Sequence, residues 1–325
     1  MLPNRSAEVD STALRAVDSS GSESRSPAIH TVGLRKQFRA TVALRGLSMT
    51  VERGEVFGFL GPNGAGKTTA VKLLLGLVRR TGGEAMVLGA PAGDLETRRR
   101  IGYLPELFRY QGWLTAEEVL LYHCRFLELE RARRSGAVRE ALSIVGLAGR
   151  GPDKVATFSK GMQQRRGLGV ALHGNPELVV FDEPTSALDP VGRHDVREII
   201  RGLRARGTTV FLNTHLLDEA EQVCDRVAVV DQGQVVATGS LAELLGGRAT
   251  VRLRVEGLEG MWWRDLPGPG SANPEGAWVV VRDVPSGGVP DLVRHIVERG
   301  GCVQAVVPEH ESLEERFLEI LKEHE

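Results

Sequence analysis

The stretch Gly61-Pro62-Asn63-Gly64-Ala65-Gly66-Lys67-Thr68 sets the interpretation of the whole chain, because its residue types and their order specify a ligand chemistry. The residues before it, 55–60, are a short apolar run typical of a strand. Behind it, apolar residues recur at the spacing of one helix face: Val71, Leu74, Leu75 and Val78. Strand, glycine loop and helix in this order predict a phosphate-binding loop rather than an ordinary glycine turn.

The chemistry of this loop rests on its backbone. Glycines let consecutive N–H groups turn toward one anion, and a helix that begins near Gly66 adds the positive end of its dipole. Lys67 supplies a charge for the β and γ phosphates of a nucleotide. The hydroxyl of Thr68 can bind a Mg²⁺ ion that bridges those phosphates, and Thr69 offers a second hydroxyl nearby.

Composition limits the alternatives. The chain has 325 residues, 42% of them apolar, and a net charge of −1, so it can bury one large domain and a smaller one. The balanced charge gives no electrostatic basis for binding nucleic acid. Cys124, Cys224 and Cys302 are widely spaced, which disfavours a disulfide framework and a zinc site. With no apolar leader and no run of about 18 apolar residues, we expect a chain that is neither secreted nor membrane-spanning by itself.

The N-terminal third precedes and contains the loop. Residues 1–26, rich in Ser, Glu, Asp and Arg, are predicted to be a disordered leader. Two strand-like segments follow, 28–34 and 42–51. Phe38 lies in their connection, where it either stacks on a base or packs against the protein.

Polar groups follow two later apolar strands. The strand 178–181 ends in Asp182 and Glu183, which places both acids at the carboxyl edge of a buried parallel sheet, beside the glycine loop if the two strands are neighbours. One acid could hold Mg²⁺ while the other orients or deprotonates a water, or the pair could cap the next helix. His215 follows the strand 208–212 and either reaches a γ-phosphate or is an ordinary hydrogen-bonded group.

The block 107–172 is predicted to be all-helical. Thr115 and Glu118 form a capping box at the start of one helix. Ser159 suits the N-cap of another, whose first residues, including Gly161, form either a second anion site or a plain cap. Asp189 and Pro190 look like the cap and first residue of a third helix, which Gly207 ends.

Five segments resemble, in order and spacing across residues 28 to about 245, the nucleotide-binding subunit of an ATP-binding cassette (ABC) transporter: 61–69, 158–162, 178–183, 186–189 and His215. The resemblance implies an α/β fold, a P-loop NTPase core with an antiparallel β subdomain and a helical subdomain. The core is expected over 27–246, with the helical subdomain at about 107–172.

The resemblance also assigns ATP and Mg²⁺ as cofactors and gives roles to residues. Phe38 takes the adenine, 61–69 the phosphates, and Thr68, Asp182 and Glu106 the metal. Glu183 becomes the general base and His215 the γ-phosphate switch. Ser159 and Gly161 contact the ATP of the opposite subunit, and Asp189 faces the dimer interface.

Two positions depart from the usual pattern of this family. Glu106 stands where Gln is usual, and Lys160-Gly161-Met162 replaces a Gly-Gly-Gln ending. A carboxylate at position 106 can still ligate Mg²⁺, although it adds negative charge beside the phosphates. These departures, with the run Tyr103-Leu104-Pro105-Glu106, resemble the subgroup that serves bacterial ABC-2 type exporters of drugs, lipids or polysaccharides.

The resemblance therefore implies an ATP-hydrolysing subunit that drives a membrane exporter. Its partners would be a second copy of itself and a separate integral membrane permease, with no nucleic acid, at the cytoplasmic face of the bacterial membrane. An importer subunit is the nearer alternative. A soluble ABC ATPase acting on nucleic acid or the ribosome is the other, but such proteins typically carry a coiled-coil insertion or two cassettes.

The segment 247–325 is predicted to be a small accessory α+β domain. Its expected elements are strands at 250–255, 277–281 and 302–307 and helices at 290–298 and 313–321. Ser312 and Glu315 should cap the last helix. The domain is either a structural or dimer-supporting cap or a regulatory ligand site.

Overall fold

The protein is described from a computed structural model that covers residues 26–108, 110–186, 188–245, 248–267, 271–285, 287–310 and 312–324. The predicted leader, apart from Ser26, lies outside the described residues. Ala187 of the segment 186–189 and the predicted boundary at 246–247 lie outside them too.

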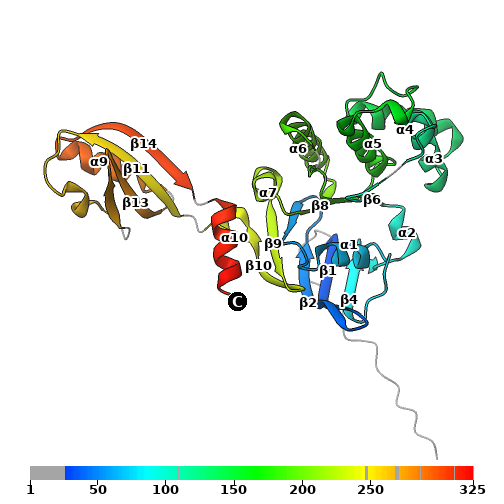
Figure 1. The fold of residues 1–325 in the computed structure, drawn as a ribbon, viewed down its shortest axis with the longest axis horizontal. Coiled ribbons are helices and arrows are strands. Elements are labelled where there is room, and N and C mark those ends of the chain that lie inside the picture. The colour runs from blue at the N-terminus through cyan, green and yellow to red at the C-terminus, as the bar shows by residue number, and fades with distance from the viewer. Residues whose placement is uncertain are drawn as a thin grey trace, which may run out of the picture.

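Six strands form the central sheet, in the order β10-β9-β3-β8-β7-β6 (Figure 1). They are β3 (Val56–Leu60), β6 (Ile101–Leu104), β7 (Leu178–Asp182), β8 (Thr209–Thr214), β9 (Arg226–Asp231) and β10 (Gln234–Ser240). Neighbours pair in parallel except β9 with β10, which form an antiparallel hairpin. The strand of the glycine loop, β3, and the strand of the paired acids, β7, are not neighbours, because β8 lies between them. The acids were expected beside the glycine loop if these two strands were neighbours, and the strands are not neighbours. Both strands nevertheless end at the same edge of the sheet.

Successive residues of the central strands pack into two different apolar clusters. In β3, Val56 and Leu60 join the cluster that contains the helical block, whereas Phe57 and Phe59 join the one formed with β1, β2 and α1. The same alternation divides the residues of β7, β8 and β9. A parallel sheet covered on both faces needs apolar side chains at every position, which explains the unbroken apolar runs in the sequence.

A second, antiparallel sheet packs beside the first in the order β2-β1-β4-β5. Its strands are β1 (Ile29–Phe38), β2 (Thr41–Val51), β4 (Gly82–Val87) and β5 (Ala90–Pro91). Phe38 is the last residue of β1 and not part of the connection that follows. The helix after the glycine loop, α1, spans Lys67–Leu74 and ends earlier than its apolar spacing predicts. Val78 lies beyond it, past Gly76 with φ +64°, and still packs on the same cluster.

Helices make up the block between β6 and β7, join the later strands, and include one short helix before β6. They are α2 (Leu95–Arg98), α3 (Ala116–Phe126), α4 (Arg131–Ile144), α5 (Lys160–Leu172), α6 (Pro190–Ala205), α7 (Leu217–Val223) and α8 (Leu241–Leu244), with a 3₁₀ turn at Val155–Thr157. The capping box of Thr115 and Glu118 is confirmed, as are the N-caps Ser159 and Asp189. Within the described ranges, no helix has the length and apolar character needed to cross a bilayer.

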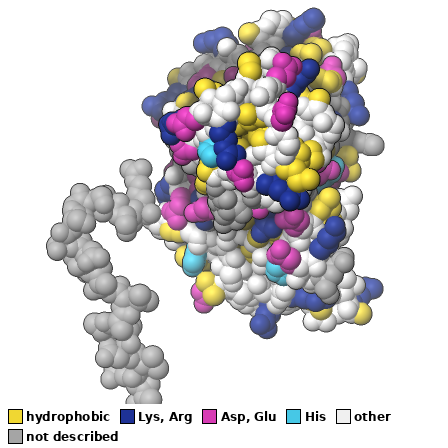
Figure 2. All heavy atoms as spheres, turned by 90° about the vertical axis from the view of Figure 1, so that its left-hand side faces the viewer, with side chains coloured by type: hydrophobic (Ala, Val, Ile, Leu, Met, Phe, Trp, Pro, Cys, Tyr) yellow, Lys and Arg dark blue, Asp and Glu magenta, His cyan; other side chains and the backbone are white. Residues whose placement is uncertain are grey.

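The C-terminal segment forms a third sheet, antiparallel throughout, in the order β12-β13-β11-β14. Its elements are β11 (Arg248–Glu256), a 3₁₀ turn (Trp262–Asp265), β12 (Ala272–Glu275), β13 (Trp278–Pro285), α9 (Val289–Glu298) and β14 (Cys302–His310). The short edge strand β12, which contains Pro274, was not predicted. In Figure 1 this domain projects to one side of the core, and on the face shown in Figure 2 acidic and basic side chains are interspersed.

The last helix, α10 (Leu313–Lys322), begins at the predicted capping box but does not pack on the accessory sheet. Leu313, Phe317 and Ile320 are buried in the cluster of the central sheet and helical block. The backbone N–H of Leu313 donates to the Glu221 carboxylate, which belongs to α7. The chain thus leaves the core after α8, forms the accessory domain and returns to the core. The sequence analysis assigned the last helix to the accessory domain, whereas α10 packs on the core.

Candidate functional site

The glycine loop lies at the carboxyl edge of the central sheet, between β3 and α1. A Cβ at Gly61 would come within 2.3 Å of the Val230 carbonyl oxygen, and one at Gly66 within 2.5 Å of the Ala43 oxygen. Gly64 and Gly66 also have φ of +87° and +96°. Only glycine fits these positions without moving backbone. No side chain caps α1, so its first N–H groups remain available to an anion.

Lys67 is buried at the start of α1, with 7% of its surface exposed. Its Nζ donates to the carbonyl oxygen of Gly61 at 2.6 Å and to that of Pro62 at 3.2 Å. Burial lowers the pKa of Lys67, while Glu183 and Asp182 oppose that shift. The ammonium group is thus held inside the loop by weak neutral acceptors that an anionic ligand could replace.

Asp182 and Glu183 lie at the same edge, at the end of β7, and both are buried. Asp182 accepts a hydrogen bond from Asn213 Nδ2 at 2.5 Å. Burial raises the pKa of Asp182, and the Asn213 hydrogen bond opposes the increase. Burial also raises the pKa of Tyr103 to about 12, with the nearby Asp182 as the next cause.

Glu183 is held in an uncommon backbone conformation, with φ +51°. Its carboxylate accepts from His215 Nδ1 at 2.8 Å and from Thr214 Oγ1 at 3.3 Å. The backbone N–H of Glu183 donates to the Asn213 carbonyl oxygen at 2.9 Å. These bonds offset the local strain and fix the direction of the carboxylate.

Lys67, Glu183 and His215 line one cavity of about 380 Å³, a size that suits a small-molecule ligand, whereas Asp182 is not among its lining residues. Its lining consists of Thr41, Val42, Ala43, Pro62, Asn63, Gly64, Gly66, Lys67, Thr68, Thr69, Glu106, Glu183, Asn213 and His215. The structure therefore brings together the glycine loop, Glu106, Glu183 and His215 from four separate parts of the sequence.

Comparisons with known proteins agree with this geometry. A family model described as ABC transporter matches residues 44–186. An uncharacterised ABC transporter ATP-binding protein of Nostoc sp. is 40% identical and is aligned over 89% of this chain and 88% of its own length. The chain belongs to the ABC transporter ATP-binding proteins.

Two further matches describe relatives of this ABC ATPase. A fluoroquinolones export ATP-binding protein of Mycobacterium tuberculosis is 43% identical over 67% of this chain and 71% of its own. A solved dimeric ATP-binding cassette in a post-hydrolysis state, bound to ADP and Pi, has a TM-score of 0.60 at 25% identity. That match covers 66% of this chain and 98% of the solved one. The fold and the ATPase class expected from the sequence are confirmed.

Some residues predicted for the ABC ATPase site lie elsewhere. Phe38 is 44% exposed and does not line the cavity; the Lys36 ammonium lies 4.5 Å from its ring centre. Ser159 and Gly161, at the start of α5, do not line it either, and Ser159 accepts from the Met162 N–H as a cap. Asp189 accepts from the Gly192 N–H at the start of α6.

Other residues of the site were missed. Thr41, Val42 and Ala43 line the cavity because the β1–β2 hairpin folds over the glycine loop. Asn213 reaches Asp182 from the neighbouring strand β8, and its pairing opposite Asp182 depends on the strand order. Its position at the end of an apolar strand, two residues before His215, was the available sequence signal.

The donor groups present fit ATP and a hard metal cation. The charges of Glu183, Asp182 and Glu106 each act to raise the pKa of Lys67, against the effect of burial. Mg²⁺ prefers oxygen ligands and commonly takes one or two carboxylates together with substrate phosphates. The Thr68 hydroxyl, Asp182 and Glu106 are the groups that would hold it, next to the N–H groups of the loop.

Proposed function

We propose that this ATPase works as a dimer, in which each ATP lies between the cavity of one copy and the start of α5 in the other. The observation that carries the proposal is the division of the predicted site. One chain gathers Lys67, Glu183 and His215 around a cavity, whereas Ser159 and Gly161 lie outside that lining. Ser159 is exposed at a helix N-terminus, which is suited to phosphate once a second copy approaches.

The chemistry at the cavity follows from the positions of the side chains. Lys67 leaves the carbonyl groups of the loop and binds the β and γ phosphates, together with the N–H groups of the loop. Glu183 acts as the general base for the attacking water, oriented by Thr214 and His215. Bound Mg²⁺ would neutralise phosphate charge, held by Thr68, Asp182 and Glu106.

His215 links the base to the ligand. Its ring is within 2.8 Å of Glu183 while 44% of the side chain is exposed toward solvent, so it can contact both the base and an incoming γ-phosphate. In this proposal, loss of the γ-phosphate releases His215 and favours reopening of the dimer. Asp189, at the cap of α6, lies on the side that meets the second copy.

A membrane permease would dock on the helical block. Four apolar or aromatic side chains there are each more than half exposed: Leu107, Trp113, Tyr122 and Phe126. Tyr122 and Phe126 stack edge to face at 4.8 Å, and ring contacts continue through His123 to Tyr110. Exposed aromatic groups of this kind are typical of protein interfaces.

We further propose that the transported process is export and that the chain lies at the cytoplasmic face of the membrane. The export-type name of the Mycobacterium tuberculosis relative supports this, as does Glu106 in the exporter-like position. We retain 27–246 as the ATPase unit and 247–310 as the accessory domain, with α10 packed on the former.

The direct test is Glu183→Gln in the presence of the permease. The variant keeps the size of the side chain and loses the base, so ATP turnover should fall about 10²–10⁴-fold while ATP binding persists. Ser159→Arg is the companion variant, because a bulky cation at the opposing surface should also stop turnover without changing ATP binding to a single chain. Unchanged turnover in either variant would contradict the proposed site.

Co-purification tests the partner. The wild-type chain should be recovered with an integral membrane protein from solubilised membranes, and Tyr122→Glu with Phe126→Glu should reduce that recovery strongly. Glu140→Lys, on α4, is a control at an exposed position, with a charge change of the same size and opposite sign. Recovery that is insensitive to the aromatic substitutions would place the permease elsewhere.

A further inference from the structure

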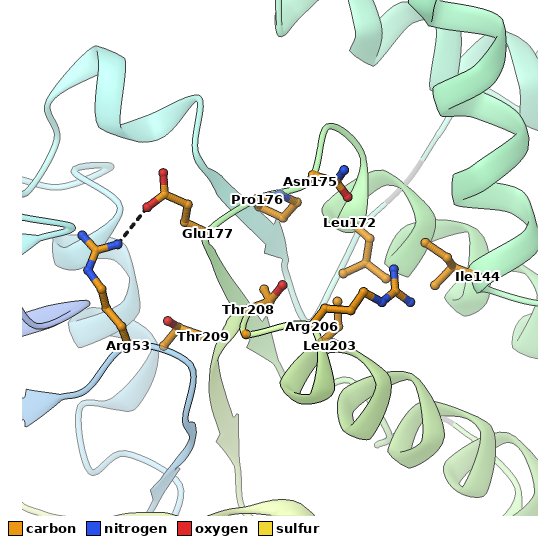
Figure 3. Close-up of a pocket in the computed structure, with 11 residues that line it drawn as sticks. Arg53, Ile144, Leu172, Asn175, Pro176, Glu177, Leu203, Arg206, Thr208 and Thr209 are labelled. Carbon is orange, nitrogen blue, oxygen red and sulfur yellow. Dashed lines mark hydrogen bonds and ion pairs between the residues drawn. The ribbon is translucent and has the colours of Figure 1, made fainter. Parts of the chain in front are cut away.

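A second cavity, of about 420 Å³, lies at the amino edge of the central sheet, opposite the nucleotide site (Figure 3). Its lining comes from the starts of β7 and β8, the ends of α4, α5 and α6, and the turn before β3. These residues are Arg53, Ile144, Leu172, Asn175, Pro176, Glu177, Leu203, Arg206, Gly207, Thr208 and Thr209. None of the residues that line this cavity has a role in the proposed ATPase site.

One wall of this cavity is apolar. Leu172 and Leu203 are almost fully buried, and Ile144 on α4 extends the same surface. Pro176 is buried beside them. A further cavity, of about 300 Å³, shares Ile144, Leu172 and Asn175, so the apolar surface continues along α4. There is room here for the hydrocarbon body of a ligand rather than for a few waters.

The opposite wall carries polar donors without protein acceptors. Within the part of the chain that the structure describes, no acid pairs with Arg206, and neither the Asn175 amide nor the Thr208 hydroxyl has a hydrogen-bond partner. Figure 3 shows the Arg206 side chain reaching from the end of α6 toward Leu172 and Ile144. A guanidinium beside an apolar wall is suited to the acidic head of an amphipathic ligand.

The remaining charges at the cavity do not cancel that of Arg206. Glu177 accepts from Arg53 at 2.8 Å and from Arg100 Nε at 2.6 Å. Two arginines share this one carboxylate, which leaves the cavity and its rim with a positive excess. A bound cation would meet Arg206 without a counter-charge, whereas an anion would be attracted.

Two strands that begin at this cavity, β7 and β8, carry residues of the nucleotide site at their other ends. Strand β7 runs from Leu178, next to Glu177, to Asp182, and β8 runs from Thr209 to Thr214. Helix α5 follows its N-cap Ser159 and ends at Leu172. A ligand that wedges between Leu172 and Arg206 would bias the position of α5 relative to the sheet, and so the position of its start.

We propose that this cavity binds a small amphipathic monoanion, an aliphatic or aromatic body with one carboxylate or sulfonate, and that its occupancy changes ATP turnover. Binding rests on the cavity alone. The change in turnover rests on the proposed function, because it acts through α5 and the opposed nucleotide.

Calorimetric titration of the full chain with octanoate, below its micelle concentration, tests binding. Octylamine has the same hydrocarbon chain and the opposite charge, and serves as the ligand control. Arg206→Gln removes the unpaired guanidinium, while Arg201→Gln removes an exposed arginine of the same helix that is paired with Glu198. Both positions are exposed, so both variants should fold.

The proposal expects saturable binding of one octanoate per chain, weakened about tenfold or more by Arg206→Gln and unchanged by Arg201→Gln, as expected for a charge-assisted hydrogen bond. Octylamine should bind much more weakly. Absence of saturable octanoate binding, equal binding of octylamine, or wild-type affinity in Arg206→Gln would each overturn it.

ATP turnover measured with saturating octanoate tests the coupling separately. A changed rate in the wild type that is lost in Arg206→Gln supports the coupling. An unchanged rate with octanoate bound overturns the coupling while leaving binding and the proposed ATPase site intact. Failure of Glu183→Gln to lower turnover would instead count against the proposed function and not against octanoate binding.

Discussion

The two edges of the central sheet carry similar residues in opposite electrostatic conditions. At the carboxyl edge, burial lowers the pKa of Lys67 and raises that of Asp182, so both charged forms are held at a cost. At the amino edge, hydrogen bonds from Arg100 and Arg53 lower the pKa of Glu177 to about 2. At the carboxyl edge, a bound ligand can stabilise the charges of Lys67 and Asp182. At the amino edge, arginines of the protein itself already stabilise the carboxylate of Glu177.

This difference separates function from stability along the same strands. Strand β7 begins beside the ion network of Glu177 and ends at Asp182 and Glu183. A substitution at the carboxyl edge should therefore change activity with little loss of stability, and one in the ion network of Glu177 should do the reverse. Three substitutions test that separation, and their expected effects on activity decrease from Lys67 to Glu177.

Lys67→Ala should produce the largest change. Loss of the ammonium removes a charge-assisted contact to phosphate, so ATP turnover should fall by at least about 10²-fold, with weaker ATP binding. Lys72→Ala, an exposed lysine on the same helix, is the control and should behave as the wild type. ATP affinity and turnover both persisting in Lys67→Ala would show that this edge is not the phosphate site.

Asn213→Ala should have an intermediate effect. It removes the hydrogen bond to Asp182 and leaves a buried carboxylate without that donor. Residues that orient a metal ligand typically contribute about 10–100-fold to activity, so turnover should fall by that factor and need more Mg²⁺. Asn213→Asp should be worse than Asn213→Ala, because a third buried acid would repel Asp182. Equal Mg²⁺ dependence in all three proteins would contradict this role.

Glu177→Gln should have the smallest effect on activity and a measurable effect on stability. The carboxylate is 43% exposed, so solvent screening limits its contribution to the free energy of unfolding to about 1 kcal/mol. Because folding lowers its pKa, the wild type should exceed the variant in stability above the ordinary pKa of 4.5, and the difference should vanish as the pH falls toward 2. Urea unfolding at several pH values measures it. A tenfold loss of turnover in this variant would break the separation of the two edges.

The sequence predicted most of the strands, the capping boxes and most of the cavity lining, because these depend on local order. Ser159 and Asp189 cap their helices as their position before each helix suggests. The paired acids follow an apolar strand and do reach the edge of the glycine loop, although through an intervening strand.

The features that could not be predicted from the sequence depend on contacts between distant segments. The apolar face of α10 was recognised, but nothing local states that Phe317 is buried in the core cluster rather than on the accessory sheet. Asn213 acquires its role only because β8 lies beside β7. Phe38 has the residue type for stacking, yet its ring is paired with Lys36 outside the cavity lining.

The central claim is that the site is completed by a second copy of the chain. Sedimentation of Glu183→Gln with and without ATP tests it most directly, since this variant should bind ATP and not release the closed state. With ATP and Mg²⁺ the account predicts a species of twice the chain mass of 35.3 kDa, which Ser159→Arg in the same chain abolishes. A Glu183→Gln protein that binds ATP and stays at 35.3 kDa at every concentration would contradict the account.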